Sequence, residues 1–78
     1  MELTADQIIG FLTKTRNVPG LEEQTALFSD GTIDSVGMVE LIVFLEAEAG
    51  IEVGQADVTL ENFDTVARVL AFVRERQG

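Results

Sequence analysis

The sequence predicts an all-α fold, a small four-helix bundle of three long helices and one short helix with a long first loop. Two stretches carry apolar residues at the i, i+3, i+4, i+7 spacing of a helix face, and a third stretch between them is apolar on almost all sides. Residues that start and stop helices flank these stretches. No strand-like alternation of apolar and polar residues extends beyond three positions. We expect residues 1–78 to form one domain with a single modest core.

The composition is that of a globular protein with an acidic surface. Apolar residues make up 46% of the chain and charged residues 24%, so disorder is not expected. The formal net charge is −9, from 14 acidic and 5 basic residues. This charge opposes binding to nucleic-acid phosphates or anionic lipid and favours partners with basic patches. We expect a monomer that binds neither nucleic acid nor a membrane.

Missing residue types and short apolar runs restrict the function further. The chain has no cysteine and no histidine, which excludes disulfides, thiolate chemistry and zinc ligation by sulfur. The most apolar run, Val36–Leu45, is interrupted by Gly37 and Glu40 and is too short to span a membrane. Met1-Glu2 begins the chain with an acidic residue, unlike a signal peptide. We therefore expect a cytoplasmic protein.

The first helix is predicted to begin after Thr4. Thr4 and Gln7 have the spacing of a capping box, and Leu3 can pack on the first apolar residue of the helix as a hydrophobic staple. The apolar face then comprises Ile8, Phe11, Leu12 and Thr15. This helix should end before Asn17, and in any case before Pro19-Gly20.

A loop of about seventeen residues, 17–33, follows and has no clear periodicity. Loops of this length are uncommon in compact domains unless they are functional or held down by their own apolar residues. Four residues can anchor this one: Leu21, Leu27, Phe28 and Ile33.

The second helix is predicted at Ser35–Ala49, with Asp34 as its N-cap and Gly50 as its C-terminal stop. It is apolar nearly all round, apart from a narrow acidic strip of Glu40, Glu46 and Glu48. A stripe of Val39, Leu41 or Ile42, and Leu45 is sufficient to face the core, which would leave the other apolar residues exposed.

The C-terminal third should contain a short helix and a long one. Ile51–Val53 is predicted to be extended, and Thr59–Phe63 to form one or two helical turns. Asp64 is the predicted N-cap of the last helix. Its buried face comprises Val66, Val69, Leu70 and Val73. Arg74 and Arg76 occupy its last turn, where the helix dipole favours cations.

The candidate functional residue is Ser35, in the first turn of the second helix. Unpaired backbone N–H groups and the positive end of the helix dipole favour a phosphate ester there. An Asp-Ser pair alone is more often a simple helix cap. Its context is more specific: a loop ending in Gly31-Thr32-Ile33, then Asp34-Ser35-Val36, Glu40 five residues after the serine, and a helix ending at Ala49-Gly50.

This junction and its context, which extend over nearly the whole chain, resemble acyl and peptidyl (aminoacyl) carrier proteins. The resemblance implies that Ser35 carries a covalent 4′-phosphopantetheine arm beside Asp34 and that the chain is a non-catalytic carrier of thioester-bound intermediates. A phosphopantetheinyl transferase would attach the arm, which fits a chain without a histidine to activate Ser35. Further implied partners are an acyl- or aminoacyl-loading ligase and downstream synthases or transferases with basic docking patches.

The second helix also suggests where these partners dock. By resemblance, its mixed acidic and apolar strip would face the basic patches of partner enzymes. The candidate docking residues are Val36, Met38, Glu40, Val43, Glu46 and Ala47. The simpler interpretation of the glutamates is a solvated helix face.

Two positions after Asp34-Ser35 depart from the usual family pattern. Val36 replaces the more frequent leucine, and Gly37 replaces the acidic residue usual in fatty-acid carriers. Gly37 removes a docking charge and weakens the first helical turn. Together with the segment Glu61–Ala67, it is more similar to free-standing carriers for amino acids or dedicated pathways.

Three other functions explain parts of the sequence but not all of it. Asp30–Asp34 matches part of an EF-hand loop, but Ala26, Phe28 and Gly37 would occupy required ligand positions, so we expect no metal site. An acidic helical interaction domain without a prosthetic group would explain the charge and the apolar second helix, but not the serine junction. Catalysis by the adjacent Glu22 and Glu23 would need a cleft that so short a chain is not expected to form.

Overall fold

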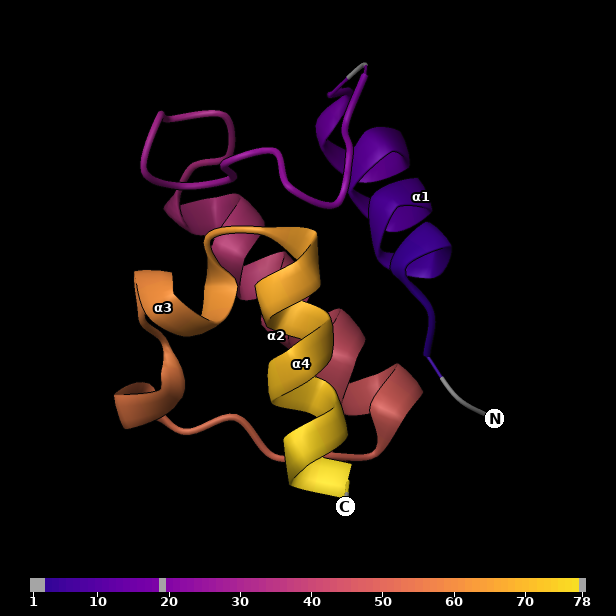
Figure 1. The fold of residues 1–78 in the computed structure, drawn as a ribbon, viewed down its shortest axis with the longest axis vertical. Helices are drawn as coiled ribbons and strands as arrows, with labels where there is room; N and C mark the ends of the chain where they lie inside the picture. Colours follow the sequence, from indigo (N-terminus) through magenta and orange to yellow (C-terminus); the bar gives the residue numbers. More distant parts are fainter. Residues whose placement is uncertain (1–2, 19, 78) are drawn as a thin grey trace.

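The computed structural model describes residues 3–18 and 20–77, and all regular secondary structure within these ranges is helical. The elements are α1 (Ala5–Arg16), α2 (Ser35–Ala49), a 3₁₀ turn η1 (Gln55–Asp57), α3 (Leu60–Phe63) and α4 (Val66–Gln77). In Figure 1, α4 lies in front of α2, with α1 on one side and α3 on the other, and α4 packs against all three other helices. The predicted all-α fold is confirmed, and η1 is an element that the sequence analysis missed.

The start of α1 has the predicted capping box. Thr4 Oγ1 accepts a hydrogen bond from the Gln7 N–H (3.3 Å), and Gln7 Oε1 accepts one from the Thr4 N–H (2.9 Å). Leu3 and Ile8 are both buried in the core. The predicted start of the helix is therefore correct, whereas the expectation about Met1-Glu2 lies outside the described residues.

The predicted face of α1 is correct except at its last position. Ile8 and Leu12 are fully buried, and the half-buried Phe11 stacks on Phe44 of α2 with 4.2 Å between ring centroids. Thr15 is exposed, and its hydroxyl donates a hydrogen bond to the Phe11 carbonyl (2.7 Å). A threonine hydroxyl that bonds to its own helix backbone in this way can remain at the surface, so Thr15 does not extend the apolar face.

The first loop is anchored as predicted. Leu21, Leu27 and Ile33 are buried, and Phe28 packs against the core while partly exposed. The Leu27 N–H donates to the Asp64 carbonyl (2.6 Å), and the Ile33 N–H donates to the Leu27 carbonyl (2.7 Å). Tertiary contacts therefore fix this loop. Helix α1 ends at Arg16, as predicted, and Pro19 lies outside the described residues.

The buried face of α2 differs from the predicted one. Leu41 and Leu45 are fully buried, but Val39 is 60% exposed. Residues 39 and 41 are about 200° apart around a helix, so one narrow stripe cannot bury both. Ile42, the alternative to Leu41 in the predicted stripe, is half-buried and packs against the core, and so do Met38 and Phe44, which lie outside that stripe.

The C-terminal part confirms the predicted faces but not the predicted cap. Gly50 ends α2 in the left-handed conformation (φ 67°). The Arg68 N–H donates to Thr65 Oγ1 (3.1 Å), so Thr65 rather than Asp64 caps the start of α4. Aspartate and threonine both cap helices. Here the Asp64 carboxylate instead accepts hydrogen bonds from the Phe28 and Ser29 N–H groups, so Thr65 is the cap. All four predicted core residues of α4 are buried, together with Phe72.

The core is filled by aromatic and aliphatic side chains. Phe63 is fully buried, and its ring centroid lies 5.4 Å from that of Phe72. Within 3–18 and 20–77, none of the helices combines the length and the apolar character needed to cross a membrane.

Candidate functional site

Ser35 is the first residue of α2, and its side chain lies on the surface. Asp34 precedes it in extended conformation, and Asp34 Oδ1 accepts a hydrogen bond from the Gly37 N–H (2.9 Å). The Asp34 carbonyl accepts the first helical bond, from the Met38 N–H (3.0 Å). Asp34 is therefore the N-cap that the sequence predicts, and it places the Ser35 hydroxyl at the positive end of a fifteen-residue helix.

Arg16, the last residue of α1, joins this junction from outside α2. Its Nη2 donates to both carboxylate oxygens of Asp34 (3.0 and 3.1 Å), and its Nη1 donates to Glu40 Oε1 (2.9 Å). Sequence reasoning missed this residue. A basic residue near the end of a helix is a common dipole partner, and the sequence carries no local signal of contacts 18 and 24 positions away.

Gly37 is buried against the junction and leaves no room for a side chain. A Cβ atom at this position would lie 2.3 Å from Ile33 Cγ2 and 3.3 Å from Arg16 Nε. Real contacts between carbon atoms are close to 3.5–4.0 Å. From the sequence alone, Gly37 means a lost docking charge and a weaker first helical turn, whereas the structure gives a steric reason for glycine.

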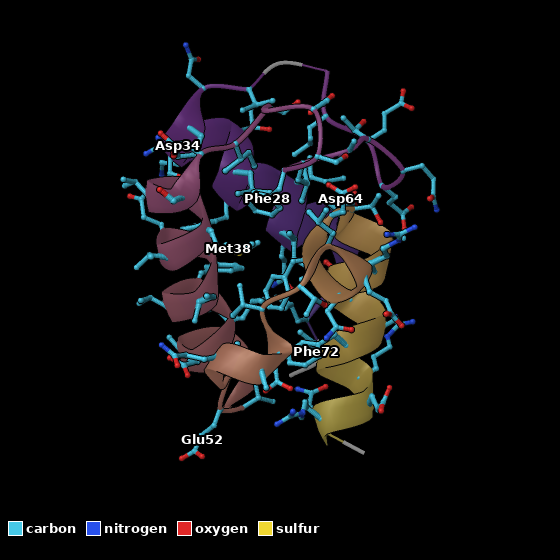
Figure 2. The ribbon with its side chains drawn as sticks, turned by 90° about the vertical axis from the view of Figure 1, so that its left-hand side faces the viewer. Phe28, Asp34, Met38, Glu52, Asp64 and Phe72 are labelled. Carbon is cyan, nitrogen blue, oxygen red and sulfur yellow. The ribbon has the colours of Figure 1, made fainter. Side chains whose placement is uncertain are left out.

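Asp64 positions the loop that leads to Ser35. Its Oδ1 accepts hydrogen bonds from the N–H groups of Ser29 (2.9 Å) and Phe28 (3.0 Å), and its Oδ2 accepts one from the Ser29 hydroxyl (2.8 Å). The Ser29 and Phe28 N–H groups, which bind the charged form, lower the pKa of Asp64 from its ordinary value of 3.8. Figure 2 shows Phe28, Asp34 and Asp64 at the same end of the molecule.

The candidate docking residues occupy different environments. Three valines on α2, Val36, Val39 and Val43, are 59 to 60% exposed, and Ala47 is exposed too, whereas Met38 is half-buried. Glu40 is paired with Arg16, and Glu46 Oε2 accepts a hydrogen bond from the Val53 N–H (3.0 Å). The structure brings the valines onto one exposed side of α2 and gives both glutamates partners within the chain.

In the segment that resembles an EF-hand loop, the acidic side chains are hydrogen-bonded within the chain. Asp30 Oδ1 accepts hydrogen bonds from the N–H and hydroxyl of Thr32 (3.0 and 2.6 Å), while Asp34 is held as described above. The part of the chain that the structure describes contains no group of three or more acidic side chains arranged to hold a metal ion. Glu22 and Glu23 are both exposed in the first loop.

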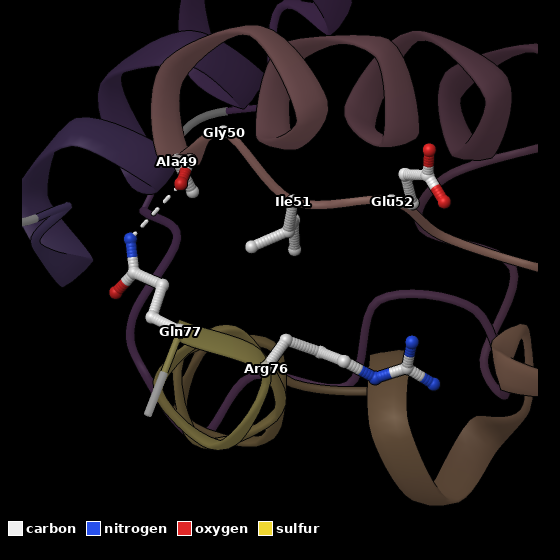
Figure 3. A pocket seen from close by; sticks show the side chains of 6 residues that line it. All are labelled: Ala49, Gly50, Ile51, Glu52, Arg76 and Gln77. Carbon is white, nitrogen blue, oxygen red and sulfur yellow. Dashed lines mark hydrogen bonds between the residues drawn. The ribbon is translucent and has the colours of Figure 1, made fainter.

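A pocket of about 470 Å³ lies at the opposite end of α2 (Figure 3). It is lined by Ala49, Gly50, Ile51, Glu52, Arg76 and Gln77. Gln77 Nε2 donates to the Ala49 carbonyl (3.1 Å), and Arg76 pairs with Asp57 and lies over the Phe72 ring. Because α2 has fifteen residues, this pocket is about 20 Å from Ser35 along the helix axis.

An acidic four-helix bundle whose second long helix begins with an exposed serine has the architecture of a carrier protein. Known proteins support this class. The acyl carrier protein AsbD of Bacillus anthracis is 40% identical over 62 residues, which cover 80% of this chain and 68% of AsbD. The chain therefore belongs to the acyl and peptidyl carrier protein family.

Two further relatives have different names within the same family. The D-alanyl carrier protein of Abiotrophia defectiva is 40% identical over 50 residues, 64% of this chain and 63% of its own length. A probable acyl carrier protein, PigG, of Serratia is 34% identical over 55 residues, 70% of this chain and 63% of its own length. The match thus spans slightly less than two thirds of these two proteins. No family model matches the chain.

Proposed function

We propose that Ser35 carries a covalent 4′-phosphopantetheine arm and that the chain delivers acyl or aminoacyl groups, held as thioesters on this arm, to biosynthetic enzymes. The observation that carries the proposal is the exposed hydroxyl of Ser35 at the N-terminal end of α2. The membership of the carrier protein family supports it. In this proposal, residues 1–78 form one carrier domain, monomeric and cytoplasmic.

The residues around Ser35 fit a phosphodiester. The first turn of α2 supplies the positive end of the helix dipole, and Arg16 neutralises part of the charge of Asp34. The chain has one other serine, Ser29, and its hydroxyl donates to the Asp64 carboxylate. Ser35 is thus the serine with both the exposure and the electrostatic setting for the arm.

The chain itself acts as the substrate of this modification. It has no histidine, so a phosphopantetheinyl transferase must remove the Ser35 proton. The Ser35 oxygen forms the new bond to phosphorus, and the phosphorus–oxygen bond to the adenosine bisphosphate half of coenzyme A breaks. The thiol of the attached arm supplies the thioester linkage, which a chain without cysteine could not provide.

We propose an amino acid or a short acyl group as the cargo. The name of the D-alanyl carrier protein that matches this chain supports an aminoacyl cargo, and the acyl carrier relatives keep a short acyl group open. The fully buried Phe63 also supports it, because a filled core leaves less space for a long chain. Loading trials with amino acids and acyl groups of increasing length test this part directly.

The proposed partners are the transferase, a loading ligase, and downstream synthases or transferases, which dock on α2. The proposed contact residues are Val36, Met38, Glu40, Val43, Glu46 and Ala47, and Val39 joins them because it is 60% exposed. The acidic surface would attract basic docking patches before contact and so speed association, whereas the valines would supply apolar contact.

The test is intact-protein mass spectrometry after incubation of the purified chain with coenzyme A, Mg²⁺ and a broad-specificity phosphopantetheinyl transferase. We expect the parent and Ser29→Ala to gain one phosphopantetheine and Ser35→Ala to gain none. Ser29→Ala is the matched control because it removes the other serine.

A parent chain that gains no mass with several transferases would overturn the proposal. The exposed valines of α2 would then favour an acidic interaction domain without a prosthetic group. Partner binding by such a domain would survive Ser35→Ala.

A further inference from the structure

Arg16 holds two acidic residues at the start of α2. Its guanidinium contacts Asp34 through Nη2 (3.0 Å) and Glu40 through Nη1 (2.9 Å). The Arg16 side chain is 27% exposed, compared with 61% for Asp34 and 43% for Glu40. Partial removal from water strengthens such contacts relative to those of a fully exposed pair.

Gly37 provides the space in which the guanidinium lies. Because a Cβ atom at position 37 would be 3.3 Å from Arg16 Nε, most side chains there would crowd the arginine. Arg16 therefore lies across the first turns of α2, next to the residue that precedes Ser35.

Attachment of the proposed arm changes the charge of this cluster. Before attachment, Asp34 and Glu40 carry two negative charges against the one positive charge of Arg16. The phosphodiester adds another negative charge on the neighbouring residue, Ser35. Like charges this close destabilise the folded chain unless a cation offsets them. The guanidinium of arginine, with five N–H donors and a permanent charge, suits carboxylate and phosphate oxygens.

The other basic residues lie elsewhere. Of the five in the chain, Arg68, Arg74 and Arg76 belong to α4, and Lys14 is exposed on α1. Arg68 donates to the Leu60 carbonyl (3.2 Å), and Arg76 pairs with Asp57. Among the contacts of the described residues, the cation against Asp34 is Arg16.

We infer that Arg16 is the charge partner of the phosphodiester on Ser35 and stabilises the modified chain more than the unmodified one. This inference rests on the proposed function. Arg16 takes no part in the chemistry of attachment; it contacts Asp34 and Glu40 and offsets the added charge from beside them.

The test compares thermal unfolding of the unmodified and modified forms of the parent, Arg16→Gln and Arg76→Gln at low ionic strength. Mass spectrometry first establishes that each modified sample carries the arm. Arg16→Gln should lower the unfolding midpoint of the modified form by about 3 °C more than that of the unmodified form. Arg76→Gln, which breaks an Arg–Asp pair at the far end of α2, should lower both midpoints equally.

Two additional measurements separate charge from packing. Arg16→Lys, which keeps the charge, should recover most of the difference between the two forms, and 0.5 M salt should reduce it. Glu40→Gln retains Arg16 and removes a competing acid, so it should raise the midpoint of the modified form relative to the unmodified one. This variant also serves if Arg16→Gln does not fold.

Equal shifts of both forms in Arg16→Gln, or an equal response of both forms to Glu40→Gln, would overturn the inference. Arg16 would then only connect α1 to α2. Failure of the parent to acquire the arm is a different result, visible in the mass before any heating, and it would overturn the proposed function instead.

Discussion

The two ends of α2 are built alike but expose different chemistry. At each end an arginine from the last turn of another helix reaches an acidic residue, Arg16 to Asp34 and Arg76 to Asp57. The N-terminal end presents the Ser35 hydroxyl on the surface, whereas the C-terminal end contains the pocket of about 470 Å³. Under the proposed function the chain needs an accessible attachment point rather than a pocket, so this pocket would not mark the functional end.

The glycines at the two ends are also required for different reasons. Gly37 is buried and lacks space for a Cβ atom, whereas Gly50 has open space around it but a left-handed backbone (φ 67°). A residue that adds volume but tolerates the left-handed conformation should therefore destabilise the chain at position 37 and not at position 50.

Among the substitutions that compare the two ends of α2, the largest effect is expected from asparagine at Gly37. Gly37→Asn should lower the free energy of unfolding by about 2–3 kcal/mol, because the new side chain collides with Ile33. Gly50→Asn should change it by less than about 1 kcal/mol, since asparagine tolerates the left-handed conformation. Urea unfolding followed by circular dichroism measures both. Equal losses would show that the close contact at Gly37 relaxes easily.

Arg76→Gln should cost about 1 kcal/mol of stability, since it removes a partly exposed ion pair and a contact with the Phe72 ring. It should leave the rate of arm attachment to Ser35 unchanged, because the two sites are at opposite ends of α2. A time course of the mass increase tests this. A slower attachment would mean that the pocket end takes part in recognition by the transferase.

The loop at the N-terminal end should make stability depend on pH through Asp64. Its folded-state pKa is below its ordinary value of 3.8, so its stabilising contribution is complete above about pH 4 and is lost as the pH falls through the folded-state pKa. Asp64→Asn should flatten the loss of stability below pH 4. Ser29→Ala retains both backbone hydrogen bonds to Asp64 and should give an intermediate slope. Unfolding midpoints measured between pH 2 and 6 test this. The same pH dependence for the parent, Asp64→Asn and Ser29→Ala would contradict it.

The smallest effect is expected on the exposed side of α2. Val39→Ala should change the free energy of unfolding by about 0.5 kcal/mol or less, as is usual for surface positions. Leu41→Ala, two residues away but fully buried, is the control and should cost about 2–5 kcal/mol. Urea unfolding measures both variants. Similar losses at both positions would mean that Val39 is buried in the core.

Local patterns predicted the helix starts and ends well. The Thr4 and Gln7 capping box, the Asp34 cap before Ser35 and the Gly50 stop each depend on residues within a few positions of one another. The membership of the carrier family was likewise predicted from the junction around Ser35 and confirmed by the relatives. The role of Ser35 itself stays a prediction.

What the sequence missed depends on contacts between distant segments. Helix α2 is apolar on nearly every side, so its periodicity cannot distinguish Val39 from Leu41 as the core residue. Asp64 was predicted as a cap because caps are local, but it binds Phe28 and Ser29, 36 and 35 residues away. The contacts of Arg16 have the same non-local character.

The attachment of the first loop has a consequence for how this chain can vary in length. Arg16 ties the start of the loop to Asp34 at its end, and Leu27 and Ile33 fix its second half. The exposed residues Glu22–Gln24 therefore lie between two fixed points, the buried Leu21 and Leu27. Lengthening a flexible loop between fixed ends costs only about 0.6 kcal/mol for each doubling. Insertions there would leave the entry into α2 unmoved, so the spacing between the first helix and Ser35 is free to differ among chains that share this junction.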